Sequence, residues 1–315
     1  MVRRTTVFLT LTLPLLASLP QSASADGAQP IWPKRVAGPN GEAWPAIPLR
    51  FYFEYGHGTA ESKNHPLSTV DIERDRFTIG ADFMTSWLSF FGLNIQFTKV
   101  HDQGTQQPFV FSLDTQKDFT GGHFYYAHYV APRLLAGFSV DYHRATGRSI
   151  YNLVVVNHET SKYYSFAPFL QHEYPVSNAM RLTQGIALYF NRGDYSYDIN
   201  IPPTAATRET ILRVPIGVEY DVTRNFTVSG IATWNQILSI ETFDNMPAPD
   251  RSTLTLTAAA RYRLDNGMSL YGHVSHDVLD DAYRSTRFTI GMSVAPSFFW
   301  APLGAPPRTP PRIVK

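Results

Sequence analysis

Residues 252 to 264 constrain the fold of this chain more than any other segment. Apolar and polar side chains alternate along it, with Leu254 and Leu256 falling on one side of an extended strand and Thr253 and Thr255 on the other. Successive side chains of a strand point to opposite faces, so this spacing predicts a strand with one apolar and one polar face. Such a strand must lie between an apolar phase and a polar one.

The same division recurs in twelve segments between residues 48 and 296. We therefore predict an all-β fold built from one long series of strands. The expected strands are 48–57, 74–84, 87–100, 118–130, 133–144, 161–174, 179–192, 208–221, 224–237, 252–264, 267–277 and 285–296.

The links between these strands alternate in length. Short turns are expected at 85–86, 131–132, 175–178, 223 and 265–266. Five of the six other links run about 14 to 17 residues, so short turns gather at one edge of the sheet and long loops at the other. A secreted β-sandwich or lectin-like domain remains an alternative, since its strands also alternate, but it does not explain this asymmetry.

The N-terminus predicts export from the cytoplasm. Arg3 and Arg4 precede an apolar run over residues 7–19, and Ala23-Ser24-Ala25 follows it. A charged start, a short apolar centre and a small-residue exit are typical of a secretory signal peptide. We expect residues 1–25 to be a signal peptide that is cleaved near Ala25.

Proline-rich segments flank the predicted strands. Residues 26–47 are rich in proline and glycine, and residues 297–315 are rich in proline. Proline supplies no backbone N–H, which excludes a stable helix or a central strand there. We expect 26–47 to be an extended periplasmic leader or plug and 297–315 a periplasmic tail that offers a possible partner site.

Charge and composition exclude several classes of function. Cleavage after residue 25 removes two arginines and no acid, which leaves 25 basic against 26 acidic residues. Binding to nucleic acid is therefore not expected. The mean hydropathy of −0.18 excludes a bundle of transmembrane helices. The chain contains no cysteine, so a large sheet must provide its stability without disulfides.

Together these features predict a single closed antiparallel transmembrane β-barrel of about 12 strands, with short periplasmic turns and longer extracellular loops. Hydrocarbon cannot satisfy backbone N–H and C=O groups, so a spanning sheet must close and turn its apolar side chains outward. Aromatic side chains on the expected outer face mark two interfacial girdles. These are Tyr55, Phe97, Tyr142, Phe190, Trp234 and Phe288 on the loop side, and Tyr174, Tyr220, Phe226 and Tyr262 on the turn side.

The chain resembles the class of twelve-stranded Gram-negative outer-membrane barrels over residues 48–296, by architecture and not by a family motif. The strand 289–294 partly resembles the C-terminal assembly signal of these barrels, although it does not end the chain. The resemblance implies a Gram-negative outer membrane, contact with its lipid and lipopolysaccharide, and the outer-membrane assembly machinery as a partner. Porin-like channels, autotransporter translocators and outer-membrane phospholipases belong to this class. A translocator would carry a passenger and a pore helix before the barrel, whereas 26–47 is short and proline-broken.

Charged and polar residues on the expected inner face are candidates for lining a pore. Both signs are well represented, so a bracing lattice of salt bridges and weak anion selectivity are both consistent with them. The expected pore-lining residues are Arg50, Glu54, Arg76, Asp82, Asp141, Glu173, Arg181, Arg213, Glu219, Arg261, Arg263, Tyr271, His273, Asp277 and Arg287. Inward aromatic residues are expected to narrow or block the bore, and they include Tyr52, Phe90, Tyr125, Tyr129, Tyr163, Phe169 and Tyr189.

One pair of residues suggests lipid hydrolysis. His273 and Ser275 share a strand face, and outer-membrane phospholipases and lipid A deacylases resemble this in carrying His-x-Ser on one strand. That resemblance implies an Asn or Glu about a dozen positions later, where this chain has Arg287. The expected faces also send the pair into the lumen and not toward the membrane. We expect no enzyme activity, no cofactor and no metal site, since the histidines are scattered without metal-ligand spacing.

Three functions follow from this reasoning, in order of preference. The first is a narrow passive channel, porin-like, for small polar or charged solutes. The second is a non-conducting barrel that assists an envelope or export process. The third is a barrel lipid hydrolase that uses His273 and Ser275.

Overall fold

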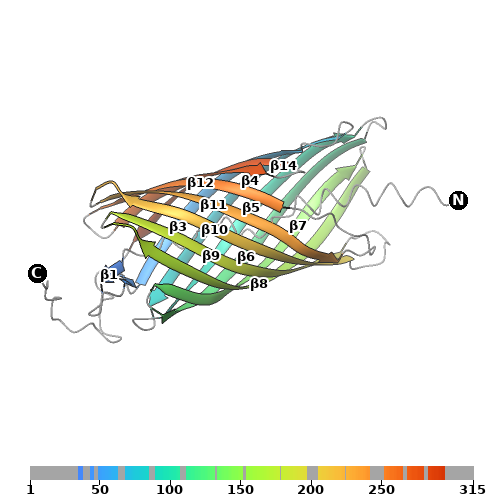
Figure 1. Cartoon of the computed structure of the whole chain (residues 1–315). Coiled ribbons are helices and arrows are strands. Elements are labelled where there is room, and N and C mark those ends of the chain that lie inside the picture. The colour runs from blue at the N-terminus through green and yellow to red at the C-terminus, as the bar shows by residue number, and fades with distance from the viewer. Residues whose placement is uncertain are drawn as a thin grey trace, which may run out of the picture. The chain divides into compact units, whose positions relative to one another are not determined.

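Within the residues that it describes, the computed structural model contains two sheets (Figure 1). It describes residues 35–37, 43–45, 49–62, 68–84, 89–106, 111–131, 133–151, 154–177, 179–196, 205–223, 225–241, 252–264, 268–279 and 283–294. The expected signal peptide and C-terminal tail lie outside the described residues. In the expected leader, β1 (Arg35–Ala37) pairs with β2 (Ala43–Pro45) as a small antiparallel sheet.

The other sheet is a closed barrel of twelve antiparallel strands, which confirms the predicted fold. Each strand pairs with its neighbour in sequence, and β14 pairs with β3 to close the ring. The strands are β3 (Leu49–Ser62), β4 (Ser68–Met84), β5 (Ser89–Gln106), β6 (Phe111–Ala131), β7 (Leu134–Tyr151), β8 (Val154–Pro175), β9 (Met180–Ser196), β10 (Ala205–Asp221), β11 (Phe226–Glu241), β12 (Ser252–Arg263), β13 (Met268–Leu279) and β14 (Tyr283–Val294).

The barrel wall has an apolar outside and a polar inside. Leu256 is 45% exposed, whereas Thr253 on the opposite face of β12 is 5% exposed. The expected girdle residues on the outer face include Tyr142 and Phe190 toward the long-link edge and Tyr174 and Tyr220 toward the short-turn edge, all exposed. In this arrangement the backbone N–H and C=O groups of each strand pair with the neighbouring strands, and the apolar side chains are left for contact with lipid.

The strands extend further toward the long-link edge than the sequence suggested. The expected loop at 58–73 is reduced to 63–67, because β3 continues to Ser62 and β4 begins at Ser68. Likewise, β7 and β8 leave only residues 152–153 between them. In the extension of β3, from Gly58 to Ser62, side chains are small or polar on both faces, so the alternation disappears although the backbone ladder continues.

Side chains help to close two of the short turns. The Ser177 hydroxyl accepts hydrogen bonds from the backbone N–H groups of Ala179 and Met180, at 3.3 and 3.1 Å. The Thr223 hydroxyl does the same for Asn225 and Phe226, at 3.3 and 3.0 Å. These are the local side-chain to backbone bonds that favour serine and threonine in turns.

Arg133 occupies the turn between β6 and β7 with a left-handed φ of 67°. The sequence pattern placed this residue at the start of a strand. The strand instead begins at Leu134. A positive φ is uncommon outside glycine, so this turn carries some backbone strain.

Large inner side chains lie over glycines of the neighbouring strand. An added Cβ at each of these glycines would overlap the side chain opposite it in the ladder. The pairs are Tyr52 with Gly80, Tyr125 with Gly92, His143 with Gly121, and Tyr271 with Gly291. The absent side chains let these rings lie against the wall.

The part of the chain that the structure describes contains no helix that is long and apolar enough to cross a membrane.

Candidate functional site in the barrel interior

The two sides of the barrel interior differ in packing. Inner side chains of β3 to β7 are mostly buried, with Gln96 1% and Glu54 2% exposed. Inner side chains of β9 to β12 are mostly half-buried, and those of Arg181 and Glu219 are 24% and 27% exposed. Solvent therefore reaches the interior beside β9 to β12 more than beside β3 to β7.

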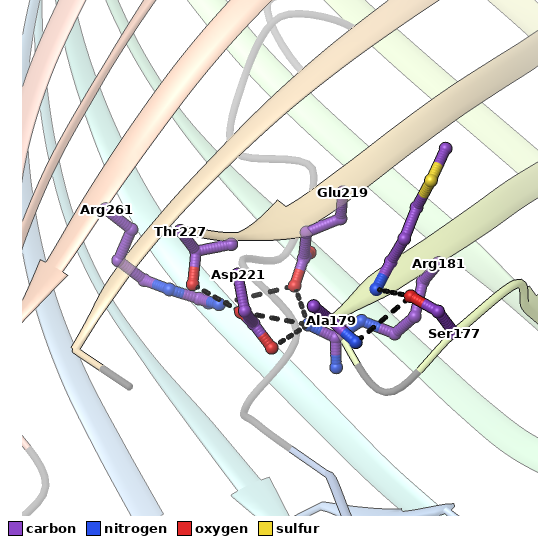
Figure 2. Close-up of polar contacts among 8 residues, drawn as sticks. Ser177, Ala179, Arg181, Glu219, Asp221, Thr227 and Arg261 are labelled. Atoms are coloured by element: carbon purple, nitrogen blue, oxygen red, sulfur yellow. Dashed lines mark hydrogen bonds and ion pairs between the residues drawn. The ribbon is translucent and has the colours of Figure 1, made fainter. Parts of the chain in front are cut away.

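A group of charged residues, which we call the turn-side cluster, lies at the short-turn edge of this accessible side (Figure 2). The Arg181 guanidinium donates to Glu219, and its Nη2 lies 3.5 Å from Asp221 Oδ2. Arg261 Nη2 lies 3.6 Å from Glu219 Oε1, and the Thr227 hydroxyl donates to Asp221 at 2.8 Å. Two arginines and two carboxylates therefore share one network across four strands.

Strand ends bring this cluster together. Glu219 lies opposite Arg181 in the β9–β10 ladder, and Asp221 follows two residues later on the same inner face. The contact between Glu219 and Arg261 reaches across β11 on the inner face of the barrel wall. These charges largely neutralise one another while remaining in contact with solvent.

Arg213 is held differently, by neutral partners. Its Nε donates to Asn235 Oδ1 at 2.7 Å, and its Nη1 donates to the Tyr189 hydroxyl at 3.3 Å. The guanidinium also lies over the Tyr189 ring, 4.6 Å from the centroid. Arg213 forms no ion pair with any carboxylate that the structure describes, so it leaves a positive charge on the accessible side of the interior.

A second group, the seam cluster, lies where β3 meets its neighbours. Arg50 Nε donates to Asp82 Oδ2 at 2.7 Å, and the Tyr125 hydroxyl donates to Asp82 Oδ1 at 2.8 Å. The Tyr271 hydroxyl donates to Glu54 Oε1 at 2.9 Å. This group is buried, so it braces the wall instead of facing open solvent.

Tyr52 and Asn94 extend the seam cluster. Asn94 Nδ2 donates to the Tyr52 hydroxyl at 3.0 Å, and the Arg50 guanidinium lies 5.6 Å from the centroid of the Tyr52 ring. Tyr52, Tyr125 and Tyr271 were all expected to point inward, and the structure places them there.

Two smaller groups contain further expected lumen residues. Asp277 accepts hydrogen bonds from Thr255 at 2.6 Å and from Arg287 at 3.1 Å, and it also accepts one from Ser285. His123 Nδ1 lies 2.7 Å from Asp141 Oδ1. A network of paired charges therefore accounts for much of the expected inner lining.

The remaining expected lumen residues also lie on the inner face. Arg76 is buried on β4, with its Nη2 near Gly56, and Glu173 is buried near the end of β8. Arg263 ends β12, and His273 lies between Ala259 and Thr289 in the ladders. Phe90, expected inward, has a side chain outside the described part.

The pair proposed for lipid hydrolysis also points inward. Ser275 is buried and receives a hydrogen bond of 3.1 Å from the Thr257 hydroxyl. Arg287 lies directly opposite Ser275 in the β13–β14 ladder. Within the described residues, no group of three or more His, Cys, Asp or Glu side chains is placed to hold a metal ion.

Sequence reasoning missed several polar partners in these groups. Asp221 and Asn235 are central to the accessible side, and Asn94 and Thr255 complete buried pairs. The sequence signal for Asp221 was its spacing of two from Glu219, which puts both carboxylates on one face. No such signal marks Asn235, because its role depends on how β10 and β11 align.

No protein-family model matches the chain, and no curated protein matches it in sequence. Its fold is nevertheless similar to solved bacterial barrels. One is the translocator domain of the autotransporter NalP from Neisseria meningitidis, with a TM-score of 0.60, 9% identity, and coverage of 79% of this chain and 88% of that one. Another is the transport unit of the autotransporter AIDA-I from Escherichia coli, with a TM-score of 0.60, 12% identity, and coverage of 78% and 89%.

An outer membrane channel from Pseudomonas putida F1 is also similar, with a TM-score of 0.52, 12% identity, and coverage of 82% of this chain and 99% of that one. At these identities the likeness concerns the fold alone. The chain therefore has the fold of the twelve-stranded outer-membrane barrel class, and its function must be argued from its own interior.

Proposed function

We propose that this protein is exported, loses its signal peptide near Ala25, and forms a narrow passive channel in the outer membrane of a Gram-negative bacterium. Its solutes are small and polar or charged. The half-buried inner side chains of β9 to β12 carry the proposal, because solvent contact along one side of the wall is what a narrow aqueous path needs. The large rings of β3 to β6 lie against the opposite wall and narrow the path.

Arg213 gives this channel a preference for anions. The arginines of the turn-side cluster have carboxylate partners, whereas Arg213 is held by an amide and a phenol. A guanidinium without a carboxylate partner attracts carboxylate and phosphate groups. In a narrow bore, one such charge biases which ions enter.

Single-channel recording in planar bilayers under a salt gradient tests both parts of this proposal. The wild-type protein is expected to conduct, and the sign of its reversal potential is expected to indicate a preference for anions over cations. Arg213→Gln should move that potential toward cations, while Arg284→Gln on the outer face should leave it unchanged. A reversal potential that does not respond to Arg213→Gln contradicts the assignment of selectivity.

A non-conducting barrel that assists an envelope or export process is the second candidate. The dense packing of buried polar and aromatic side chains along β3 to β7 favours it. Folded protein that shows neither conductance nor liposome swelling supports this candidate and rejects the channel. Removal of residues 297–315 then tests whether the tail recruits a periplasmic partner.

A further inference from the structure

Outward-facing charges near the long-link edge are arranged differently in two sectors of the barrel. From β3 to β6, the signs of one row of charges alternate from strand to strand. His57 Nδ1 lies 2.9 Å from Asp75 Oδ1, Asp75 lies opposite Lys99 in the ladder, and Lys99 lies opposite Asp118. Opposite charges therefore offset one another along this row, although Glu61 and Asp71 face each other further along β3 and β4.

From β7 to β10, like charges face each other. Arg144 lies directly opposite Lys162 in the β7–β8 ladder, and Arg192 lies directly opposite Arg208 in the β9–β10 ladder. All four side chains are exposed. We call them the basic ridge. Like charges directly opposite one another repel and destabilise a strand pair. An anion bound between them would reduce this electrostatic repulsion.

Nearby carboxylates offset the basic ridge only in part. Asp194 accepts a hydrogen bond of 3.0 Å from Arg192 and lies opposite Lys162 in the β8–β9 ladder. Asp118 lies diagonally across from Arg144. Neither Arg144 nor Lys162 forms an ion pair with any residue that the structure describes. Arg208 lies opposite Glu241 in the β10–β11 ladder, so the excess of positive charge is centred on Arg144 and Lys162.

The basic ridge lies just beyond the aromatic band of the outer wall. Tyr142 and Tyr164 face each other one step closer to the barrel centre, with ring centroids 5.2 Å apart. A two-residue step along a strand is about 7 Å, so the Arg144–Lys162 pair sits at the depth of lipid head groups. Closer still to the barrel centre, Phe166 is exposed on the same wall.

We propose that the basic ridge binds the phosphates of lipid A, the phosphorylated glycolipid anchor of lipopolysaccharide. Arg144 and Lys162 would hold a phosphate, with Tyr142 and Tyr164 beside the sugar rings and the acyl chains along Phe166. Guanidinium and ammonium groups form charge-assisted hydrogen bonds with phosphate. This inference rests on the proposed outer-membrane location and is independent of whether the barrel conducts.

A matched pair of double variants tests the site. Arg144→Gln with Lys162→Gln removes two cations of the basic ridge. Lys99→Gln with Arg284→Gln removes two outward cations that lie opposite acids, since Arg284 faces Glu61 in the β14–β3 ladder. Each protein is folded in detergent, checked by heat-modifiable migration, and titrated with bisphosphorylated lipid A by native mass spectrometry.

The ridge variant is expected to bind bisphosphorylated lipid A at least about tenfold more weakly than wild type, and the control variant to stay within about twofold. If the ridge variant does not fold, the single change Lys162→Gln takes its place, with an expected loss of about threefold. Equal affinity of all variants overturns the proposal. Binding of fully dephosphorylated lipid A with the same affinity as bisphosphorylated lipid A overturns it as well. Conductance in planar bilayers is measured separately. Failure of the proposed lipid A site and failure of the proposed channel function can therefore be distinguished.

Discussion

The Tyr271 hydroxyl donates a hydrogen bond of 2.9 Å to Glu54 across β14, joining two residues 217 positions apart in the chain. This bond ties the last strands of the barrel to the first from the inside. Both side chains are buried, so the carboxylate has little access to water as a replacement donor.

Tyr271→Phe should therefore destabilise the barrel. It removes the hydroxyl donor and leaves Glu54 buried with one fewer partner, at a cost of about 1 to 3 kcal/mol. Urea unfolding in lipid vesicles, followed by tryptophan fluorescence, measures the loss. Tyr262→Phe, on the outer face, is the control and should change the free energy of unfolding little. Equal stability of the two variants would contradict the role of this bond.

Gly80→Ala should harm both stability and conductance. An added Cβ overlaps the Tyr52 ring, which must then swing toward the bore or separate the strands. Overpacking of this kind costs about 1 to 3 kcal/mol. Gly230→Ala provides a matched control, because nothing lies within 4 Å of the Cβ it adds. The single-channel amplitude and the free energy of unfolding measured in urea should fall for Gly80→Ala only.

Glu219→Gln should make the channel more selective for anions. The change removes the carboxylate that neutralises Arg181 and Arg261 on the accessible side of the interior. The reversal potential under a salt gradient should move in the direction opposite to that produced by Arg213→Gln. Glu61→Gln, on the outer face, serves as the control. A shift toward cations would contradict the proposed lining.

Arg133→Gly should stabilise the turn between β6 and β7. Glycine adopts the left-handed region without the steric cost that Arg133 bears at a φ of 67°, although it adds freedom to the unfolded chain. The expected gain is up to about 1 kcal/mol in the free energy of unfolding. Arg133→Ala keeps the strain and should bring no gain. A loss of stability in the glycine variant would show that the Arg133 side chain contributes more than its backbone costs.

Ser275→Ala tests the remaining enzymatic alternative. Its hydroxyl is buried inside the wall and bonded to Thr257, so we expect phospholipid and lipid A patterns in cells to stay unchanged. Thin-layer chromatography and mass spectrometry of extracted lipids measure this outcome. Loss of a lipid product in the Ser275→Ala strain, with normal barrel levels, would restore the hydrolase hypothesis.

The strand count, the order of strands and the two faces of the wall were predictable from sequence. Leu256 and Thr253 illustrate why, because period-2 alternation persists wherever one face meets lipid and the other meets water. The strand ends at the long-link edge were not predictable. Beyond His57 the side chains of β3 are small or polar on both faces, so the strand continues to Ser62 without any pattern to mark it.

The hydrogen-bond and ion-pair partners of the inner side chains could not be predicted from the sequence either. Arg181 and Glu219 were both expected in the lumen, yet their pairing depends on the alignment of β9 with β10, which a long link joins. No turn geometry fixes that alignment from sequence. The neutral setting of Arg213 depends in the same way on how Asn235 and Tyr189 align with it.

Closure of β14 onto β3 has a consequence for biogenesis. The first barrel strand, β3, must wait with one hydrogen-bonding edge unsatisfied until β14, which is synthesised last, arrives to pair with it. Insertion should therefore behave as an all-or-none event, and a nascent chain stalled before Tyr283 would remain a target for periplasmic chaperones and proteases.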